Sequence, residues 1–123
     1  MNNQELIVHI CPGNTWEEAQ DQGIYRTPSL ETEGFIHCSR PDQVLKVANS
    51  FYKKIPDLVL LWINSQKVKA QIKHELGAEG TSEKFPHIYG PVNLDAVLAI
   101  YDFYPASDGI YKLVPGSIRF ENN

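Results

Sequence analysis

The segment from Asp57 to Ile63, Asp-Leu-Val-Leu-Leu-Trp-Ile, constrains the fold most, because it is apolar at consecutive positions. Alternate side chains of a strand point to opposite faces of a sheet, so a strand that is apolar on both faces must be covered on both sides. We therefore predict that residues 57–63 form a central strand. The chain has 123 residues, 42% of them hydrophobic, which suits one domain over residues 1–123 with one packed core.

The remaining elements follow from turn signals and hydrophobic spacing. Thr15-Trp16-Glu17-Glu18 resembles a capping box and predicts a helix from Thr15, as N-cap, to about Gln22, with Gly23 as its stop. Residues 24–33 are predicted to be irregular. A second helix is expected to begin at residues 39–42. Its predicted buried stripe consists of Val44, Val47, Ala48, Phe51 and Tyr52.

Strands are predicted at 5–10, 35–38, 57–63, 70–76, 85–89 and 96–104, with an edge strand at 110–114. The helices come early and most strands come late. This order favours an α+β class with mixed, mainly antiparallel sheets and two main helices.

Charge and composition narrow the classes of partner. The formal net charge of −4 argues against broad electrostatic binding to nucleic acid. No apolar run approaches the roughly 20 residues of a membrane span, and residues 1–5 lack the basic start and apolar stretch of a signal peptide. We therefore expect a cytoplasmic protein with no membrane contact. In that compartment Cys11 and Cys38 are expected to be reduced and to pack as small buried side chains.

Two short segments, each bounded by Gly or Pro, carry the candidate chemistry: Gly34-Phe35-Ile36-His37-Cys38-Ser39 and Phe85-Pro86-His87-Ile88-Tyr89-Gly90-Pro91. Histidine exchanges a proton near neutral pH, so it is a common acid–base group. In an extended chain His37 and Ser39 share one face, opposite Cys38. His87 and Tyr89 likewise share a face. Both segments are therefore predicted to offer polar groups to a cleft.

The same alternation brings in two more residues. His9 lies opposite Val8 and Ile10 on the first strand, so it can face a cleft if those residues face the core. Of His74 and Glu75 only one can face the site, and a carboxylate can bind sugar hydroxyls or stabilise a developing cation. We predict a pocket with His9, His37, Glu75 and His87 as candidate catalytic residues, and with Ser39 and Tyr89 as ligand-binding residues.

Plainer interpretations stay open for several of these residues. Each histidine can be a hydrogen-bonded structural residue, and Ser39 can be an N-cap. A helix N-terminus at Ser39 would also suit a phosphate, and both roles can hold together. A metal-dependent hydrolase is a further alternative, because four histidines, two cysteines and several carboxylates supply enough ligands. The chain lacks Cys-x-x-Cys and His-Glu-x-x-His, so no metal site is predicted.

These residues carry a resemblance to a known family, Domain of Unknown Function family 952, a group of small, mostly bacterial proteins. The resemblance covers most of the chain. Besides the two histidine segments, the matching positions are His9, Trp16, Ala19, Gly23, 29–31, Gln43, 47–49, 57–61, Glu75 and 92–97. Cys38 stands where the family often has leucine, which favours an inert role for this thiol.

The family in turn resembles the ADP-ribosyltransferase-like fold, which includes RNA 2′-phosphotransferases and consists of two small packed sheets with an NAD cleft. By this resemblance His9 matches the position that holds a ribose, and His37 matches the position near the nicotinamide. Glu75, His87 and Tyr89 compete for the third position. The resemblance implies a nucleotide-like ligand, with NAD or ADP-ribose as the leading candidate and glycosyl transfer as the reaction. The alternative is a binding module without catalysis.

Overall fold

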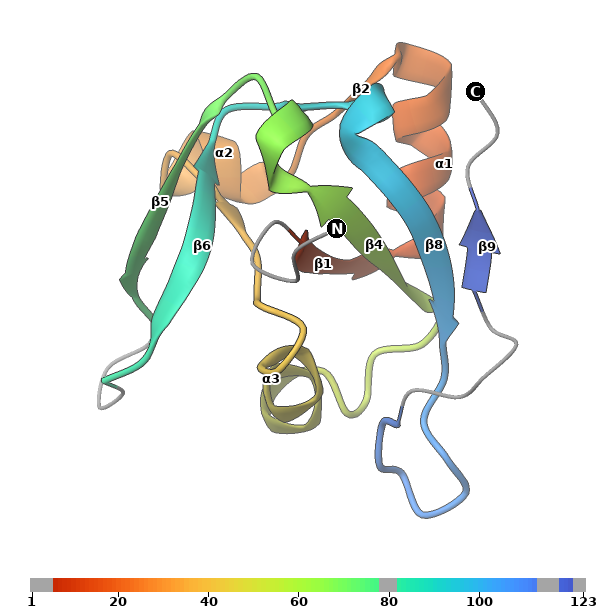
Figure 1. Ribbon diagram of the computed structural model, residues 1–123. Coiled ribbons are helices and arrows are strands. Elements are labelled where there is room, and N and C mark those ends of the chain that lie inside the picture. Colours follow the sequence, from red (N-terminus) through yellow and green to blue (C-terminus); the bar gives the residue numbers. More distant parts are fainter. Residues whose placement is uncertain (1–5, 78–81, 113–117, 121–123) are drawn as a thin grey trace.

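The computed structural model describes residues 6–77, 82–112 and 118–120, which form an α+β fold of antiparallel sheets (Figure 1). The largest sheet has the order β1 (Leu6–Pro12), β4 (Leu58–Asn64), β8 (Val97–Phe103) and β9 (Ile118–Phe120). A second sheet has the order β3 (Ile36–His37), β6 (Lys84–Tyr89) and β5 (Gln71–Leu76). The pair β2 (Ile24–Tyr25) and β7 (Val92–Asn93) forms a third. The helices are α1 (Gly13–Gln22), α2 (Pro28–Thr32) and α3 (Val44–Phe51), with 3₁₀ turns at Ser65–Lys67 and Leu94–Ala96.

The prediction of a covered central strand is confirmed. Strand β4 pairs with β1 on one side and with β8 on the other, both antiparallel. Its alternate residues enter two different clusters: Leu58 and Leu60 pack near α3, whereas Leu61 and Ile63 pack near α1. Full burial of each such side chain contributes about 1.5–3 kcal/mol, so this strand anchors both halves of the core.

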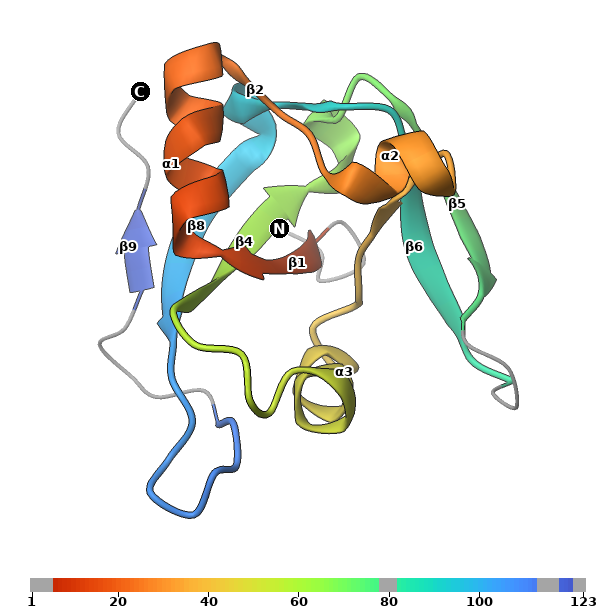
Figure 2. The ribbon, with the colours of Figure 1, turned by 180° about the vertical axis from the view of Figure 1, so that it is seen from behind.

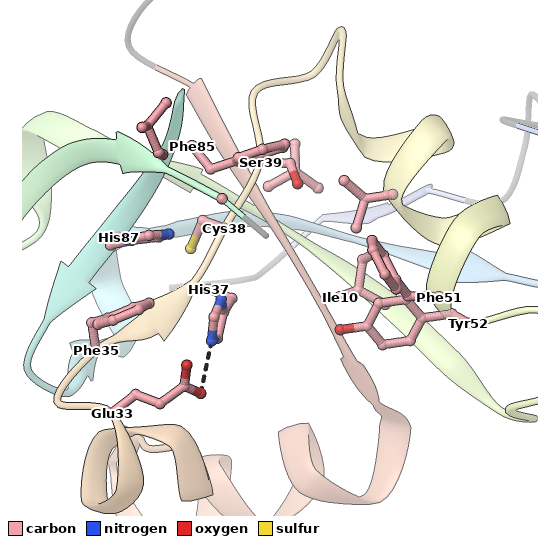
Figure 3. A pocket seen from close by; sticks show the side chains of 14 residues that line it. Ile10, Glu33, Phe35, His37, Cys38, Ser39, Phe51, Tyr52, Phe85 and His87 are labelled. Atoms are coloured by element: carbon pink, nitrogen blue, oxygen red, sulfur yellow. Dashed lines mark hydrogen bonds and ion pairs between the residues drawn. The ribbon is translucent and has the colours of Figure 1, made fainter. Parts of the chain in front are cut away.

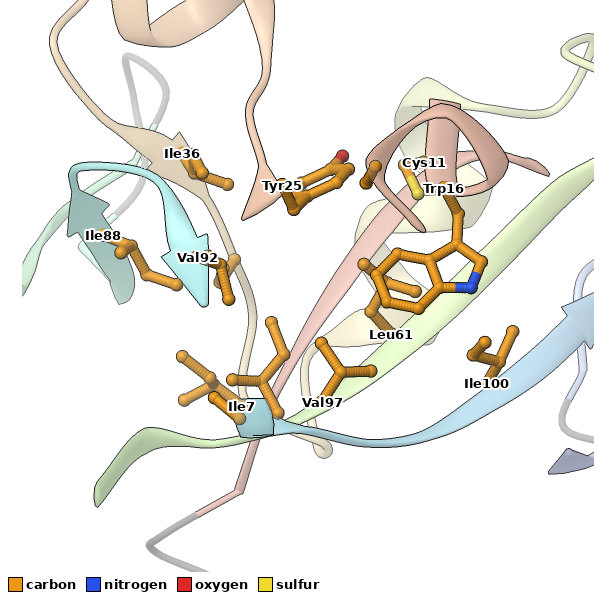
Figure 4. Packing of buried hydrophobic residues seen from close by; sticks show 14 of the residues in the cluster. Ile7, Cys11, Trp16, Tyr25, Ile36, Leu61, Ile88, Val92, Val97 and Ile100 are labelled. Carbon is orange, nitrogen blue, oxygen red and sulfur yellow. The ribbon is translucent and has the colours of Figure 1, made fainter. Parts of the chain in front are cut away.

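The two longer helices cover opposite faces of the four-stranded sheet. Figure 2 shows α1 in front of β8, and Trp16 and Tyr25 pack in the cluster near α1 (Figure 4). On the other face Val44 and Ala48 of α3 are fully buried, and they pack with β1, β4 and β8. The hydrophobic stripe predicted for α3 is correct at these two positions. It is wrong at Phe51, whose exposed fraction is 65%, because the helix ends there at the edge of the core.

One bridge joins the two larger sheets and fixes the position of the first histidine segment. The main chains of Val8 and Ser39 exchange two antiparallel hydrogen bonds of 2.8 Å. Ser39 is therefore extended backbone, and the prediction that it caps α3 is wrong. The helix begins later, at Val44, because the Gln43 side chain accepts the Arg40 N–H at 2.9 Å and stabilises a turn before it.

Three other predicted boundaries change. Helix α1 begins at Gly13, directly after β1, and Thr15 lies inside it, since the Gly13 N–H donates to the Asp57 carbonyl at 2.8 Å. Residues 24–33 contain β2 and α2, the latter with Pro28 in its first turn. Of the predicted edge strand at 110–114, residues 113 and 114 lie outside the described residues, and Tyr111 makes an isolated bridge to Pro105. Within the described part of the chain, no helix is long and apolar enough to cross a membrane.

Candidate functional site

A cavity of about 470 Å³ lies where the β3-β6-β5 sheet, strand β1 and helix α3 meet (Figure 3). We call it the Phe35 cavity. The described residues that line it are Val8, Ile10, Glu33, Phe35, His37, Cys38, Ser39, Val47, Phe51, Tyr52, Leu76, Gly77, Phe85 and His87. Figure 3 shows His37, His87 and Glu33 on one side, and Phe51, Tyr52 and Ile10 on the other. The cavity thus has a polar wall and an apolar wall, as small-molecule sites commonly do.

The register of the small sheet builds the polar wall. His37 pairs with His87 across β3 and β6, so both side chains stand on the same face, and their ring centroids are 5.5 Å apart. Phe35 precedes His37 by two residues and lies against both rings. It stacks on His87 at 4.0 Å between centroids with an interplanar angle of 17°, and it contacts Tyr89 at 5.3 Å. Ile36 and Ile88, on the opposite face, are fully buried in the core.

A carboxylate orients His87. Glu75 Oε1 lies 2.8 Å from His87 Nδ1 and 2.5 Å from the Tyr89 hydroxyl, which donates to it. Because an ionised carboxylate only accepts hydrogen bonds, Nδ1 of His87 carries the proton and Nε2 of the neutral ring is an acceptor. The hydrogen bonds from Tyr89 and His87 lower the pKa of Glu75 below its ordinary value. The same bond to Glu75 raises the pKa of Tyr89.

His37 has a carboxylate partner of its own. Its Nε2 lies 3.0 Å from Glu33 Oε2, and the two side chains are 52% and 49% exposed. This ion pair lies at the solvent side of the cavity, whereas the side chain of His87 is 6% exposed and deeper. The polar wall therefore holds two imidazole–carboxylate pairs side by side. Such pairs can bind hydroxyl groups or move a proton, because imidazole can act as an acid or a base near neutral pH.

His9 lies elsewhere, and the expectation that it faces a cleft is not met. It is 6% exposed, and its Nδ1 lies 2.6 Å from the His37 carbonyl while its Nε2 lies 2.6 Å from the Tyr25 hydroxyl. A carbonyl only accepts, so Nδ1–H donates to it, and Nε2 accepts from Tyr25. Burial lowers the pKa of His9 to about 4, so the ring is neutral at ordinary pH. The ring holds the His37 main chain from the core side.

His9 does not face a cleft because both faces of β1 are covered. Alternation would place it at a cleft only if one face of the strand were open, whereas residues 7–11 are all buried. Val8 and Ile10 belong to the cluster near α3, whereas Ile7 and Cys11 belong to the cluster near α1. His9 shares the face of Ile7 and is therefore enclosed.

Ser39 and Cys38 also line the cavity, and Ser39 does so without the predicted role at a helix N-terminus. Ser39 is 5% exposed and lies in the bridge to β1, away from any helix N-terminus. Cys38 also lines the cavity, but burial raises the pKa of its thiol, which disfavours the reactive thiolate. Among the described residues, no group of three or more His, Cys, Asp and Glu side chains is arranged to hold a metal ion.

Of the predicted site residues, His37, Ser39 and His87 line the cavity, and Glu75 and Tyr89 lie behind His87 in the same network. Sequence reasoning missed Glu33, Phe35, Phe51 and Tyr52. Alternation could have identified Phe35, because residues 35 and 37 lie on the same face of an extended chain. The others come from α3 and from the end of α2, whose placement against the sheet depends on tertiary packing.

Fold and site together define a small α+β protein whose cavity lies at the junction of two antiparallel sheets and a helix. The family model described as "Protein of unknown function (DUF952)" matches residues 10–100, and the chain belongs to this family. The crystal structure of protein CC0527 from Caulobacter crescentus is similar, with a TM-score of 0.77 at 28% sequence identity over 88% of this chain and 94% of that one. The solution structure of CC0527 gives a TM-score of 0.70 at 26% identity, over 89% and 93% of the two chains. No match was found among curated proteins.

Proposed function

We propose that this protein binds a nucleotide-like small molecule in the Phe35 cavity. The observation that carries the proposal is the composition of the cavity, which combines aromatic rings with two imidazoles in a volume of about 470 Å³. Known small-molecule sites are concave, largely apolar and provided with a few polar groups, and they commonly measure about 300–1,000 Å³. A flat ring with hydroxyl-bearing substituents matches this combination.

The binding mode follows from the two walls. A base or pyridine ring would lie between the Phe35–His87 stack and the side chains of Phe51 and Tyr52. Stacking of a base on an aromatic side chain contributes about 1–3 kcal/mol. His37 and Ser39 would bind ribose hydroxyls on the polar side. Phosphates would lie toward solvent, past the exposed Phe51 and Leu76 at the mouth.

The more specific proposal is that the ligand is NAD or ADP-ribose and that the reaction is an ADP-ribosyltransferase-like glycosyl transfer. Its support is the convergence of His37, His87, Glu75 and Tyr89 on one face of the small sheet. Glu75 would act through His87 by keeping the imidazole oriented toward the cavity. His9 would act as a positioning residue for the His37 main chain. The alternative, a binding module without catalysis, predicts the same complex but no turnover.

Calorimetric titration of the full chain with ADP-ribose and with NAD tests the binding proposal. We expect saturable heat, and about fivefold weaker binding in Phe51→Ala, because an aromatic contact is lost. Tyr104→Ala is the matched control, since Tyr104 is 62% exposed, like Phe51 at 65%, but does not line the cavity. No heat at millimolar ligand, or equal loss in both variants, would contradict the proposal.

Two further measurements separate the chemical hypotheses. Release of nicotinamide from NAD that His87→Ala abolishes would favour glycosyl transfer, whereas binding without release would favour the module. The metal-dependent hydrolase stays a prediction that elemental analysis of the purified protein can test. Stoichiometric zinc would favour the hydrolase, and a protein that binds ADP-ribose without metal would argue for the nucleotide site.

A further inference from the structure

Resting on the proposed binding function, we infer that the Phe35 cavity selects rings that carry a positive charge over neutral or anionic rings of the same shape. The ligand class would be an organic cation with a delocalised or quaternary charge, such as a pyridinium. The inference comes from the charges of the polar wall and from the aromatic faces around the cavity.

The charge of the polar wall is set by two pairs. Glu33 pairs with His37 at 3.0 Å, and Glu75 pairs with His87 at 2.8 Å. When both imidazoles are neutral, the two carboxylates give this wall two negative charges. When both imidazoles are protonated, the charges cancel. Lys73 of β5 lies opposite His87 and interacts with Glu75, so it offsets one of these charges. With both imidazoles neutral, the wall still carries one net negative charge, and its field does not favour an anion.

The other titratable groups that line the cavity do not change this result. Burial raises the pKa of Cys38, which follows β3, and of Tyr52, which follows α3, so both stay neutral near pH 7. Strand β1 contributes Val8 and Ile10, which are apolar. Lys46 on α3 forms an ion pair with Glu83 at the exposed surface.

Aromatic faces reinforce the preference. Phe35, Phe51, Tyr52 and Phe85 all line the cavity, and the face of an aromatic ring is the negative part of its quadrupole. A cation over such a face is attracted to it, most strongly when the cation is desolvated. The same sheet face already holds one example, because Lys73 Nζ lies 4.7 Å from the centroid of the Tyr89 ring.

A series of three isosteric probes tests the inference: 1-methylnicotinamide is a cation, nicotinamide is neutral, and nicotinate is an anion. Amide chemical shifts of the full chain, followed by NMR during titration near pH 8, report both the site and the affinity. We expect the cation to bind about tenfold more tightly than nicotinate, with nicotinamide between them. The shifts should map to residues that line the Phe35 cavity.

A conservative variant separates charge from shape. Glu33→Gln keeps a hydrogen-bond acceptor for His37 but removes a negative charge. It should therefore weaken binding of the cation severalfold and leave the affinity for nicotinamide unchanged. Glu31→Gln is the control, because Glu31 is an exposed residue of α2 that does not line the cavity.

The outcomes distinguish this inference from the binding function. If the probes shift cavity residues but nicotinate binds as tightly as 1-methylnicotinamide, the charge preference is wrong and the binding site stands. If Glu33→Gln leaves the ratio of cation to neutral affinity unchanged, the role given to Glu33 is wrong. If none of the three probes shifts cavity residues, the proposed ring-binding site itself is contradicted.

Discussion

Two histidine environments lie on either side of the same short strand, and they differ in the partners that the protein supplies. His9 is enclosed between the Tyr25 hydroxyl and the His37 carbonyl, both uncharged, and it has no contact with the cavity. His87 lies against Phe35 and pairs with the Glu75 carboxylate beside an open volume. An enclosed neutral imidazole with both nitrogens bonded stabilises the fold. An imidazole with one nitrogen held by a carboxylate could offer its other nitrogen to the ligand that we propose.

The largest effect expected from this comparison is on stability at His9. In His9→Leu the Tyr25 hydroxyl and the His37 carbonyl lose their partner, and unsatisfied buried groups cost about 1–3 kcal/mol each. We expect the free energy of unfolding in urea to fall by about 2–4 kcal/mol. His74→Leu, at an exposed position of β5, is the control and should change it by less than about 0.5 kcal/mol. An equal loss of unfolding free energy in both variants would show that the hydrogen bonds of His9 do not stabilise the fold.

The pH dependence of stability gives a second test of the enclosed environment of His9. Burial lowers the pKa of folded His9 to about 4 from 6.5, so between these values the unfolded chain binds more protons. Stability should therefore fall as the pH drops from about 6.5 to about 4, and this residue should account for about 3 kcal/mol of the loss. Protonation of Glu75, whose pKa is lowered, also destabilises the folded protein on acidification. The contribution of His9 is therefore measured as the difference in pH dependence between the unmodified protein and a His9 variant.

The variant for this measurement is His9→Gln, which keeps polar groups but does not titrate in this range. Urea unfolding at a series of pH values should give a shallower decline for His9→Gln than for the unmodified protein. Parallel declines in the two proteins would mean that His9 is protonated without penalty in the folded state. The environment of His9 would then be wetter than the structure indicates.

The two thiols offer a smaller test of the two environments. Cys11 packs in the cluster near α1, and burial raises its pKa to about 11, while Cys38 lines the cavity with a pKa that burial also raises. Neither should react with Ellman's reagent faster than the protein unfolds. Both should react within the mixing time in urea. Rapid reaction of Cys38 in the folded protein, identified by peptide mass, would show a reactive thiol in the cavity.

The smallest effect is expected at Glu75. Glu75→Gln weakens the hydrogen bond that raises the pKa of Tyr89, because a neutral amide replaces the carboxylate acceptor, and it also removes the nearby charge. The Tyr89 hydroxyl should therefore titrate at lower pH than in the unmodified protein. Carbon-detected NMR of labelled tyrosine rings measures this shift, and Glu31→Gln should not cause it. Unfolding in urea should change far less than in His9→Leu, because Glu75 is partly exposed. An unchanged Tyr89 titration would mean that the Glu75–Tyr89 hydrogen bond does not persist in solution.

The part of this molecule that the sequence could predict is the part set by local periodicity. The run at 57–63 indicated a central strand because apolar residues at both parities need cover on both sides. The faces of His37 and His87 followed from alternation, whereas Glu75 was chosen over His74 for the chemistry of its carboxylate. The hydrogen-bond partner of each histidine could not be predicted, because it depends on the pairing of β3, β5 and β6, which lie far apart in the sequence.

Other features were hidden for related reasons. The start of α3 could not be placed from the sequence, because Ser39 pairs with Val8, 31 residues earlier in the chain, and helix propensity does not report such a contact. Phe51 carried helical spacing but lies beyond the point where the sheet covers the helix, so it lines the cavity mouth. His9 shows the limit of alternation as a guide: it assigns a side chain to a face but does not say what lies over that face.

Chemical-shift mapping of the full chain with ADP-ribose tests the central claim most directly. Amides of the described residues report separately on the Phe35 cavity and on the His9 environment. We expect saturable shifts concentrated at residues 33–39, on β6 and on α3, with the side chain of His9 remaining neutral and bonded to Tyr25. Shifts that cluster around α1 or along β8 and leave the cavity residues unchanged would contradict it.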